Sequence, residues 1–240
     1  MLVGAYIVLR MRTPLSPRSL AVAVAIALVV AVLLPRAEAR SDQGAWLWFE
    51  YRQPVVGEAD RFPRLSWRVS LDSRFLADRG GLAQQFLRTG PLVDVTSWLY
   101  IAIHGTSFAD LHPDGVGDRE YRFELEPTFQ GRLGDFTWSD RNRFEYRWRE
   151  TVQRTRYRNQ LRVNYAPVGA RWIPFVWNEA LIDLSAGYNE NRLFGGLARM
   201  LAPNIRLEGG YLLRSRSTDD GWAQDHVGVL SLFIGWPPAK

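Results

Sequence analysis

Apolar and polar residues alternate along most of the chain from residue 44 onward. In 65–74 (LSWRVSLDSR), for example, Leu65, Trp67 and Val69 are separated by polar residues. A period of two is typical of a β-strand with two different faces. Turn-forming runs such as 78–81 (DRGG) separate such segments. The pattern predicts eleven strands, near residues 44–52, 64–75, 84–95, 97–104, 119–132, 136–149, 155–166, 173–183, 189–200, 204–215 and 223–236.

Two environments explain a strand with one apolar face. In a soluble sandwich the apolar face lies in a core and the charged face meets water, whereas in a membrane barrel the apolar face meets lipid. The segments 119–132, 136–149 and 155–166 exceed the usual length of soluble strands and suit a tilted membrane strand. The strand lengths therefore favour the membrane interpretation.

Tryptophan content also favours a membrane. The chain has 10 tryptophans, which are hard to fit into one sandwich core because each buried indole N–H needs a partner. At a membrane interface the ring lies in the apolar layer and the N–H reaches the headgroups. The residues expected on the apolar face are Trp46 or Trp48, Trp67, Trp98, Trp138, Trp148, Trp172, Trp177, Trp222 and Trp236.

Strands can cross hydrocarbon only in a closed sheet, because every backbone N–H and C=O must be paired there. We therefore expect an all-β fold, an antiparallel up-and-down transmembrane β-barrel of 10–12 strands. Because bacterial single-chain barrels have an even number of strands, ten or twelve is expected in place of eleven. The residues expected to face lipid in the arginine-rich runs are Phe144, Tyr146, Trp148, Tyr157, Leu161, Val163 and Tyr165.

The opposite face of these strands predicts the lining of the lumen. The residues are Arg122, Glu124, Glu126, Arg141, Arg143, Glu145, Arg147, Arg149, Arg154, Arg156, Arg158, Arg162, Arg206 and Glu208. Arginines in a narrow lumen must be neutralised or hydrated, so we expect an arginine–glutamate lattice. The lattice has two interpretations: a polar plug, or a passage that favours anions.

The N-terminal region resembles a secretory signal peptide. The apolar run 20–34 follows Arg12 and Arg18 and precedes an A-x-A site at Ala37 and Ala39. The alternative is a membrane anchor, but the run is shorter than the ~20 residues that cross a bilayer. We expect residues 1–39 to be removed, with Met11 as the true start, and residues 40–240 to form a single barrel domain.

The composition excludes several kinds of catalytic and binding site. The chain has no cysteine, which removes thiolate metal ligands and cysteine nucleophiles, and its net charge of +5 comes almost entirely from arginine. An exported basic protein meets anionic lipid or solutes more readily than nucleic acid, so no nucleic-acid partner is expected. Three scattered histidines predict no metal site, and no phosphate-binding glycine motif or cofactor is indicated.

Several short segments resemble the proteobacterial domain-of-unknown-function family 2490, which comprises uncharacterised outer-membrane β-barrel proteins. The resemblance implies a fold and a location, and it carries no established activity or catalytic residues. One departure is that 237–240 (PPAK) follows Trp236, whereas many outer-membrane barrels end on an aromatic residue. The matching segments are 46–51 (WLWFEY), 141–149, 157–162 (YRNQLR), 178–179, 189–197 (NENRLFGGL), 208–212 (EGGYL) and 226–227.

Few residues suggest catalysis. A serine hydrolase needs a serine and a base within hydrogen-bond reach, and His104 with Ser107 at an expected strand end is the available pair. Asp110 is close in sequence and could orient the base. The alternative interpretation is that His104 is an ordinary polar residue at a strand end. We take the protein to be non-enzymatic, with no catalytic residue.

Two further groups have functional and structural interpretations. Asp114, Asp118 and Glu120 could bind calcium, but the spacing lacks the graded ligands of a calcium loop, which favours solvated loop acids. The pairs 178–179 (NE) and 191–192 (NR) could form a specific inward cluster or a structural hydrogen-bond network.

The leading hypothesis is a non-enzymatic barrel in the outer membrane of a Gram-negative bacterium, with a structural envelope role or a narrow porin-like passage for small solutes, including anions. Its expected partners are outer-membrane lipid, lipopolysaccharide, the barrel-assembly machinery and a small anionic solute. One alternative is an outer-membrane hydrolase that deacylates lipid A or phospholipid through His104 and Ser107. Another is a soluble periplasmic β-sandwich or lipocalin-like binding protein.

Overall fold

The computed structural model describes residues 43–57, 61–77, 79–112, 115–150, 152–218 and 221–235. The expected signal peptide, the start at Met11, Asp114 and Trp236 with the tail after it lie outside these residues. Among the residues described, no helix is long and apolar enough to cross a membrane.

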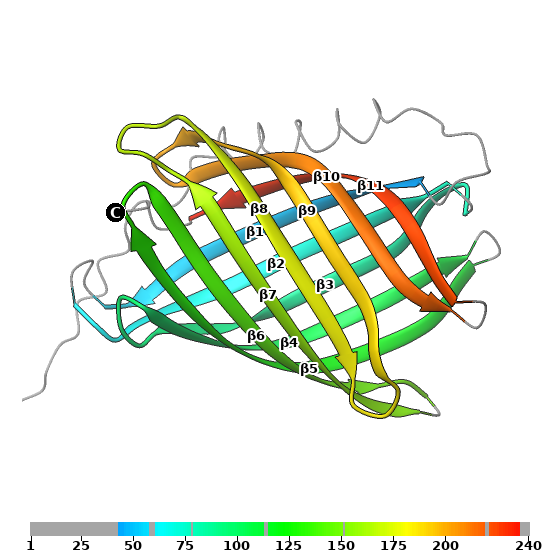
Figure 1. Ribbon diagram of the computed structural model, residues 1–240. Coiled ribbons are helices and arrows are strands. Elements are labelled where there is room, and N and C mark those ends of the chain that lie inside the picture. Colours follow the sequence, from blue (N-terminus) through cyan, green and yellow to red (C-terminus); the bar gives the residue numbers. More distant parts are fainter. Residues whose placement is uncertain are drawn as a thin grey trace, which may run out of the picture. The chain divides into compact units, whose positions relative to one another are not determined.

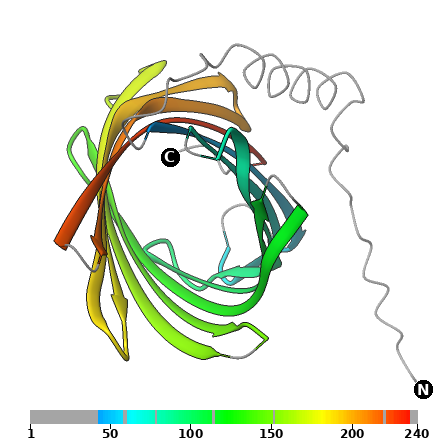
Figure 2. The ribbon, with the colours of Figure 1, turned by 90° about the vertical axis from the view of Figure 1, so that its right-hand side faces the viewer.

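Eleven strands account for most of the described chain, and they form one closed barrel (Figures 1 and 2). Each strand pairs with its neighbours in sequence, as an up-and-down barrel requires. The strands are β1 (Gln43–Val56), β2 (Arg64–Leu76), β3 (Gly81–Asp94), β4 (Leu99–His112), β5 (Gly115–Leu133), β6 (Phe136–Trp148), β7 (Gln153–Tyr165), β8 (Trp172–Asp183), β9 (Gly187–Ala202), β10 (Ile205–Thr218) and β11 (Gly221–Ile234).

The barrel closes between its first and last strands, and these run parallel. The pairing extends from Gln43 opposite His226 to Tyr51 opposite Ile234, whereas the other neighbours are antiparallel. Eleven strands lie within the expected 10–12, and the all-β barrel is confirmed. The adjustment to an even number was wrong, because a parallel closing pair allows an odd number of strands to complete the ring.

Each wall of the barrel has a charged inner face and an apolar outer face. In β2, Arg68, Asp72 and Arg74 are buried, while Trp67 and Leu71 are exposed. This arrangement follows from the period of two, since successive side chains point to opposite faces of a strand. The closed ring excludes the alternative of a two-sheet sandwich, in which the arginines would have faced outward.

The outer face carries most of the tryptophans. Six of the nine described tryptophans are exposed, namely Trp67, Trp98, Trp138, Trp148, Trp172 and Trp222. The apolar residues expected outside in β6 and β7 also lie there; Phe144 and Leu161 are about half exposed, at 48% and 51%. Tyr157 and Val163 share this face and are half-buried.

Three tryptophans face inward, contrary to the expectation. Trp46 packs in a buried cluster with Phe175, Phe194, Ala198, Leu212 and Val227, and Trp177 packs against the same cluster. Trp48 lies in the lumen beneath the guanidinium of Arg88, at 5.8 Å. The physical reason is parity: residues separated by an even number of positions in a strand lie on the same face. Trp46 and Trp48 therefore share the face of buried Glu50, and Trp177 shares that of buried Glu179. One part of the inner wall is therefore apolar.

Two facing glycines bring β9 and β10 together beside this cluster. Gly196 lies opposite Gly210, and a Cβ on either would clash with a backbone oxygen, of Gly209 and Gly195 respectively. Glycine permits this close approach of two backbones.

Candidate functional site

The lumen is lined by ionised side chains, and the expected arginine–glutamate lattice is present. Most of the fourteen residues expected to line it lie on the inner face. Seven are buried: Arg122, Glu124, Glu126, Arg143, Glu145, Arg158 and Glu208. Five more are half-buried: Arg141, Arg147, Arg156, Arg162 and Arg206.

Arg149 and Arg154 are exposed, although they share the inward parity. They flank the turn between β6 and β7, where the wall of the barrel ends. Arg149 still donates from Nε to Glu120, at 2.6 Å. Arg154 reaches only to 3.9 Å from the carboxylate of Asp183. Both residues therefore belong to the rim of the lumen.

Glu126 is the centre of the densest part of the lattice. Its side chain is fully buried and accepts hydrogen bonds from Arg68, at 2.7 Å, and from Nε of Arg143, at 2.6 Å. Two residues away, Glu124 accepts from Arg88, at 2.7 Å, and from Thr106, at 3.0 Å. Charges that are this deeply buried must be paired, because desolvation of an unpaired ion costs several kcal/mol.

Several ion pairs join strands that are not neighbours. Arg162 on β7 pairs with Glu208 on β10, at 2.6 Å, and Arg52 on β1 pairs with Asp94 on β3, at 2.6 Å. Such pairs connect strands that share no backbone hydrogen bonds. Several inner residues were not among those predicted, although the same alternation places them inside: Arg52, Arg68, Arg74, Arg88, Asp94, Glu190, Arg214 and Asp225.

The structure separates the two candidate catalytic residues. His104 is buried in the middle of β4, and not at a strand end as expected. Its ring nitrogens contact Arg68, at 3.0 and 3.3 Å. Ser107 is exposed on the outer face. Because the two residues are three positions apart in a strand, they point to opposite faces and form no catalytic pair.

The possible inward cluster at 178–179 and 191–192 is divided by the same rule. Asn178 and Asn191 lie on the outer face and exchange two side-chain hydrogen bonds, at 2.9 and 3.2 Å. Glu179 and Arg192 lie inside and form an ion pair, at 3.1 Å. The structure therefore contains two separate pairs in place of one cluster.

Two of the three possible calcium ligands, Asp118 and Glu120, lie among the described residues. Glu120 is buried and paired with Arg122, Arg147 and Arg149. The side chain of Asp118 is 74% exposed. Within the described part of the chain, no three His, Asp or Glu side chains come close enough together to hold a metal ion.

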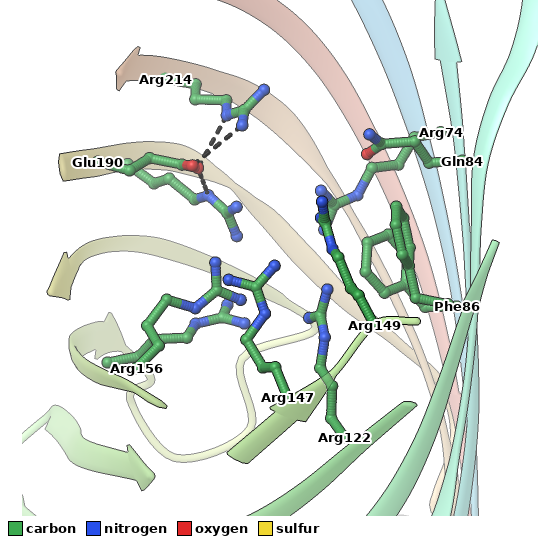
Figure 3. A pocket seen from close by; sticks show the side chains of 12 residues that line it. Arg74, Gln84, Phe86, Arg122, Arg147, Arg149, Arg156, Glu190 and Arg214 are labelled. Carbon is green, nitrogen blue, oxygen red and sulfur yellow. Dashed lines mark hydrogen bonds and ion pairs between the residues drawn. The ribbon is translucent and has the colours of Figure 1, made fainter. Parts of the chain in front are cut away.

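A cavity of about 170 Å³ lies inside one end of the lumen. We call this end the cavity rim; it carries the turns that follow β2, β4, β6, β8 and β10. Figure 3 shows the guanidinium groups of Arg122, Arg147 and Arg156 pointing into the same space. The described residues that line the cavity are Arg74, Gln84, Phe86, Phe108, Arg122, Arg147, Arg149, Arg156, Arg158, Glu190, Arg192 and Arg214.

Aromatic rings hold two of these arginines in place. The guanidinium of Arg74 lies over the rings of Trp46 and Phe86, at 3.9 and 4.3 Å. That of Arg122 lies over Phe86 and Phe108, at 5.1 and 5.4 Å. Stacking on an aromatic face stabilises a cation and leaves its N–H edge free for hydrogen bonds.

The cavity has an excess of positive charge. Eight arginines line it, and Glu190 is the one acidic residue among the described residues that do so. Seven described carboxylates pair with these eight arginines, and some of the seven are shared with arginines outside the lining, such as Glu145 with Arg143 and Glu179 with Arg141. Positive charge therefore remains in excess. The seven are the buried Asp72, Glu120, Glu145, Glu179, Glu190 and Asp225 and the exposed Asp118.

Comparison with known proteins gives one match. The family described as "Protein of unknown function (DUF2490)" matches residues 44–225, which span nearly the whole barrel. No curated protein matches the chain, and no solved structure does. The matched range covers more than half of the 240 residues, and the chain therefore belongs to the family described as protein of unknown function (DUF2490).

Proposed function

We propose that the protein is a non-enzymatic β-barrel that spans the outer membrane of a Gram-negative envelope, with a lumen closed by its ion-pair lattice. The observation that carries the proposal is the outer face. Large apolar side chains remain exposed along its strands, and they form a surface that would be unfavourable in water.

Aromatic residues on this face form two belts, one near each rim. Such belts flank the apolar band of membrane barrels, where their rings lie at the headgroups. Near the cavity rim the exposed residues are Tyr121, Tyr146, Trp148, Tyr188 and Trp222. Near the opposite rim they are Trp67, Trp98, Phe129, Phe136, Trp138, Tyr165 and Trp172. The exposed residues between the belts are mainly aliphatic, with three aromatic residues among them; they include Leu71, Leu87, Ile103, Leu161, Val176, Leu193 and Leu197 and the aromatic Phe123, Phe144 and Tyr211.

The spacing of the belts suits a bilayer. Trp138 and Trp148 lie on the same face of β6, one in each belt. Ten residues at about 3.3 Å each cover roughly 33 Å of strand, or about 25 Å along the barrel axis at a tilt of about 40°. That height equals the apolar band of outer-membrane barrels. The expected contacts with membrane lipid and lipopolysaccharide, and with the barrel-assembly machinery, belong to this proposal.

Polar residues on the outer face are hydrogen-bonded to one another. Asn159 donates to Asp140, at 2.6 Å, and to Asn142, at 3.2 Å. Tyr157 donates to Asn142, at 2.5 Å, and Asn178 pairs with Asn191 as described above. Mutual pairing lowers the cost of placing amides in hydrocarbon. The outer face therefore remains compatible with lipid at these positions.

The lattice supports a closed lumen rather than an open passage. Ion pairs between non-neighbouring strands, such as Arg68 with Glu126 and Arg162 with Glu208, place side chains across the space that a solute would use. The apolar cluster around Trp46 fills another part of the lumen. A non-enzymatic role is supported by the separation of His104 from Ser107 and by the contact of both His104 nitrogens with Arg68.

Fractionation and planar-bilayer conductance test the two halves of the proposal. We expect the protein in the outer-membrane fraction and extractable only with detergent. We also expect the refolded protein to insert without producing steady conductance steps. Recovery from the soluble periplasm would reject the location, and a stable open level would replace the closed lumen with the anion passage.

A further inference from the structure

We propose that the arginine-lined cavity binds a compact, negatively charged phosphate group. This inference goes beyond the membrane role. It depends on the barrel only for the position of the arginines, which come from β2, β5, β6, β7, β9 and β10 and from Arg149, just after β6.

The first argument is the unused hydrogen-bonding capacity of the arginines. Arg147 donates from Nε and Nη2 to the two oxygens of Glu120, and Arg156 donates from the same two atoms to Glu145. Arg74 likewise uses Nε and Nη2 on Asp72. No hydrogen bond to another described residue uses Nη1 of these three arginines. Each therefore has a planar N–H edge fixed in position and available to an anion.

The second argument is charge. The carboxylates hold the arginines in place without neutralising all of them, because they are fewer and some of them are shared with arginines outside the lining. Within a low-dielectric barrel this excess of positive charge is unfavourable unless an anion or water compensates it. A bound phosphate would supply the missing negative charge.

The third argument is geometry. Arginine forks suit carboxylate and phosphate oxygens, but a carboxylate is planar and presents two oxygens. The cavity presents guanidinium groups from several walls, as Arg122, Arg147, Arg156 and Arg214 do in Figure 3. A tetrahedral phosphate has oxygens in all these directions. The volume of about 170 Å³ holds several water molecules or a compact polyatomic anion.

Three matched variants distinguish the cavity from the rest of the lumen. Arg147→Gln and Arg156→Gln each remove one cavity guanidinium. Arg162→Gln, on the same face of β7 as Arg156, is the control, because Arg162 pairs with Glu208 away from the cavity. In every case the carboxylate keeps another arginine: Glu120 keeps Arg149, Glu145 keeps Arg158 and Glu208 keeps Arg206. The three variants should therefore fold equally well.

Binding is measured by equilibrium dialysis of the folded barrel in detergent, at constant ionic strength in chloride. One arm uses radiolabelled inorganic pyrophosphate. A second arm uses dioctanoyl phosphatidic acid, with dioctanoyl phosphatidylcholine as its control, to represent a lipid-borne phosphate. Folding of each variant is checked by its heat-modifiable migration in gels.

We expect wild-type protein to bind pyrophosphate in the presence of excess chloride. Each cavity variant should weaken binding at least about tenfold, as the loss of a charged hydrogen bond predicts, and Arg162→Gln should not. The same pattern with phosphatidic acid alone would support a lipid-borne phosphate as the source. Binding of neither probe, or equal weakening by Arg162→Gln, would overturn the proposal. Either failure would leave the membrane proposal standing, since that rests on the outer face.

Discussion

Arg68 on β2 donates from Nη2 to Oε1 of Glu126 on β5, at 2.7 Å, and so joins strands that are three places apart around the ring. Glu126 also accepts from Arg143 of β6. One carboxylate thus holds together side chains from three strands. The lumen is a charged core, in which each ion depends on its partners.

Glu126→Gln should strongly destabilise the barrel. The isosteric amide removes the carboxylate that pairs with the buried Arg68, at 2.7 Å. It also removes the nearest counter-ion of Arg143, which keeps the more distant Glu124 and Glu145, at 3.6 and 3.9 Å. Breaking a buried pair in this way typically costs about 3–5 kcal/mol. Urea unfolding in lipid vesicles, followed by tryptophan fluorescence, measures the loss. The control is Glu150→Gln on the exposed β6–β7 turn, which should change little; equal effects would contradict a charged core.

Leu87→Arg tests the outer face. Leu87 lies at the middle of β3 and is 50% exposed. An arginine there should cost about 2–4 kcal/mol if the position faces hydrocarbon, but under about 0.5 kcal/mol if it faces water. The control is Val168→Arg between β7 and β8, where the side chain is 96% exposed. The free energy of unfolding of both variants is measured in vesicles. Indistinguishable values for the two would contradict contact between Leu87 and lipid.

Asp140→Asn gives a prediction whose sign depends on the surroundings. Asp140 lies on the outer face and accepts from Asn159, at 2.6 Å. In hydrocarbon the loss of the charge should stabilise the barrel, by about 1 kcal/mol. In water the loss of a charge-assisted hydrogen bond should weaken it slightly. The direction of the change in the free energy of unfolding, measured in vesicles, is therefore sufficient. A decrease would contradict the membrane assignment.

Gly196→Ala should disrupt the contact between β9 and β10, because the added Cβ meets the backbone of Gly209. Overpacking of this kind costs about 1–3 kcal/mol. Gly195→Ala is a control one residue away, since its Cβ would meet no atom within 4 Å. Thermal unfolding of the two variants in detergent should differ clearly. Similar melting temperatures would show that the backbones separate freely.

The strands and most of their faces could be predicted from the sequence, because a period of two is a local signal. The inner position of Arg143 and the outer position of Leu161 follow from parity alone. Parity also places His104 and Ser107 on opposite faces, because the two residues are three positions apart in one strand. The same rule places Trp46 and Trp48 on the same face of β1 as Glu50, which is the inner face. Their apolar character alone suggested the outer face.

The rest could not be predicted, because it depends on contacts between distant strands. The parallel pairing of β1 with β11 is a property of the closed ring, and no local pattern reveals it. The partners of Arg68 and Arg162 lie three strands away, so their identity depends on the register of every strand between. The cavity likewise exists because eight arginines, distant in sequence, meet at one rim.

Quenching by brominated phospholipid tests the central claim most directly, because bromine on the acyl chains quenches only indoles that contact lipid. We expect strong quenching of the reconstituted barrel. Trp148→Phe, which removes an outer indole, should lower the quenched fraction, and Trp177→Phe, which removes an inner one, should raise it. Emission that is unchanged between brominated and ordinary vesicles would contradict the contact between the outer face and lipid on which the account depends.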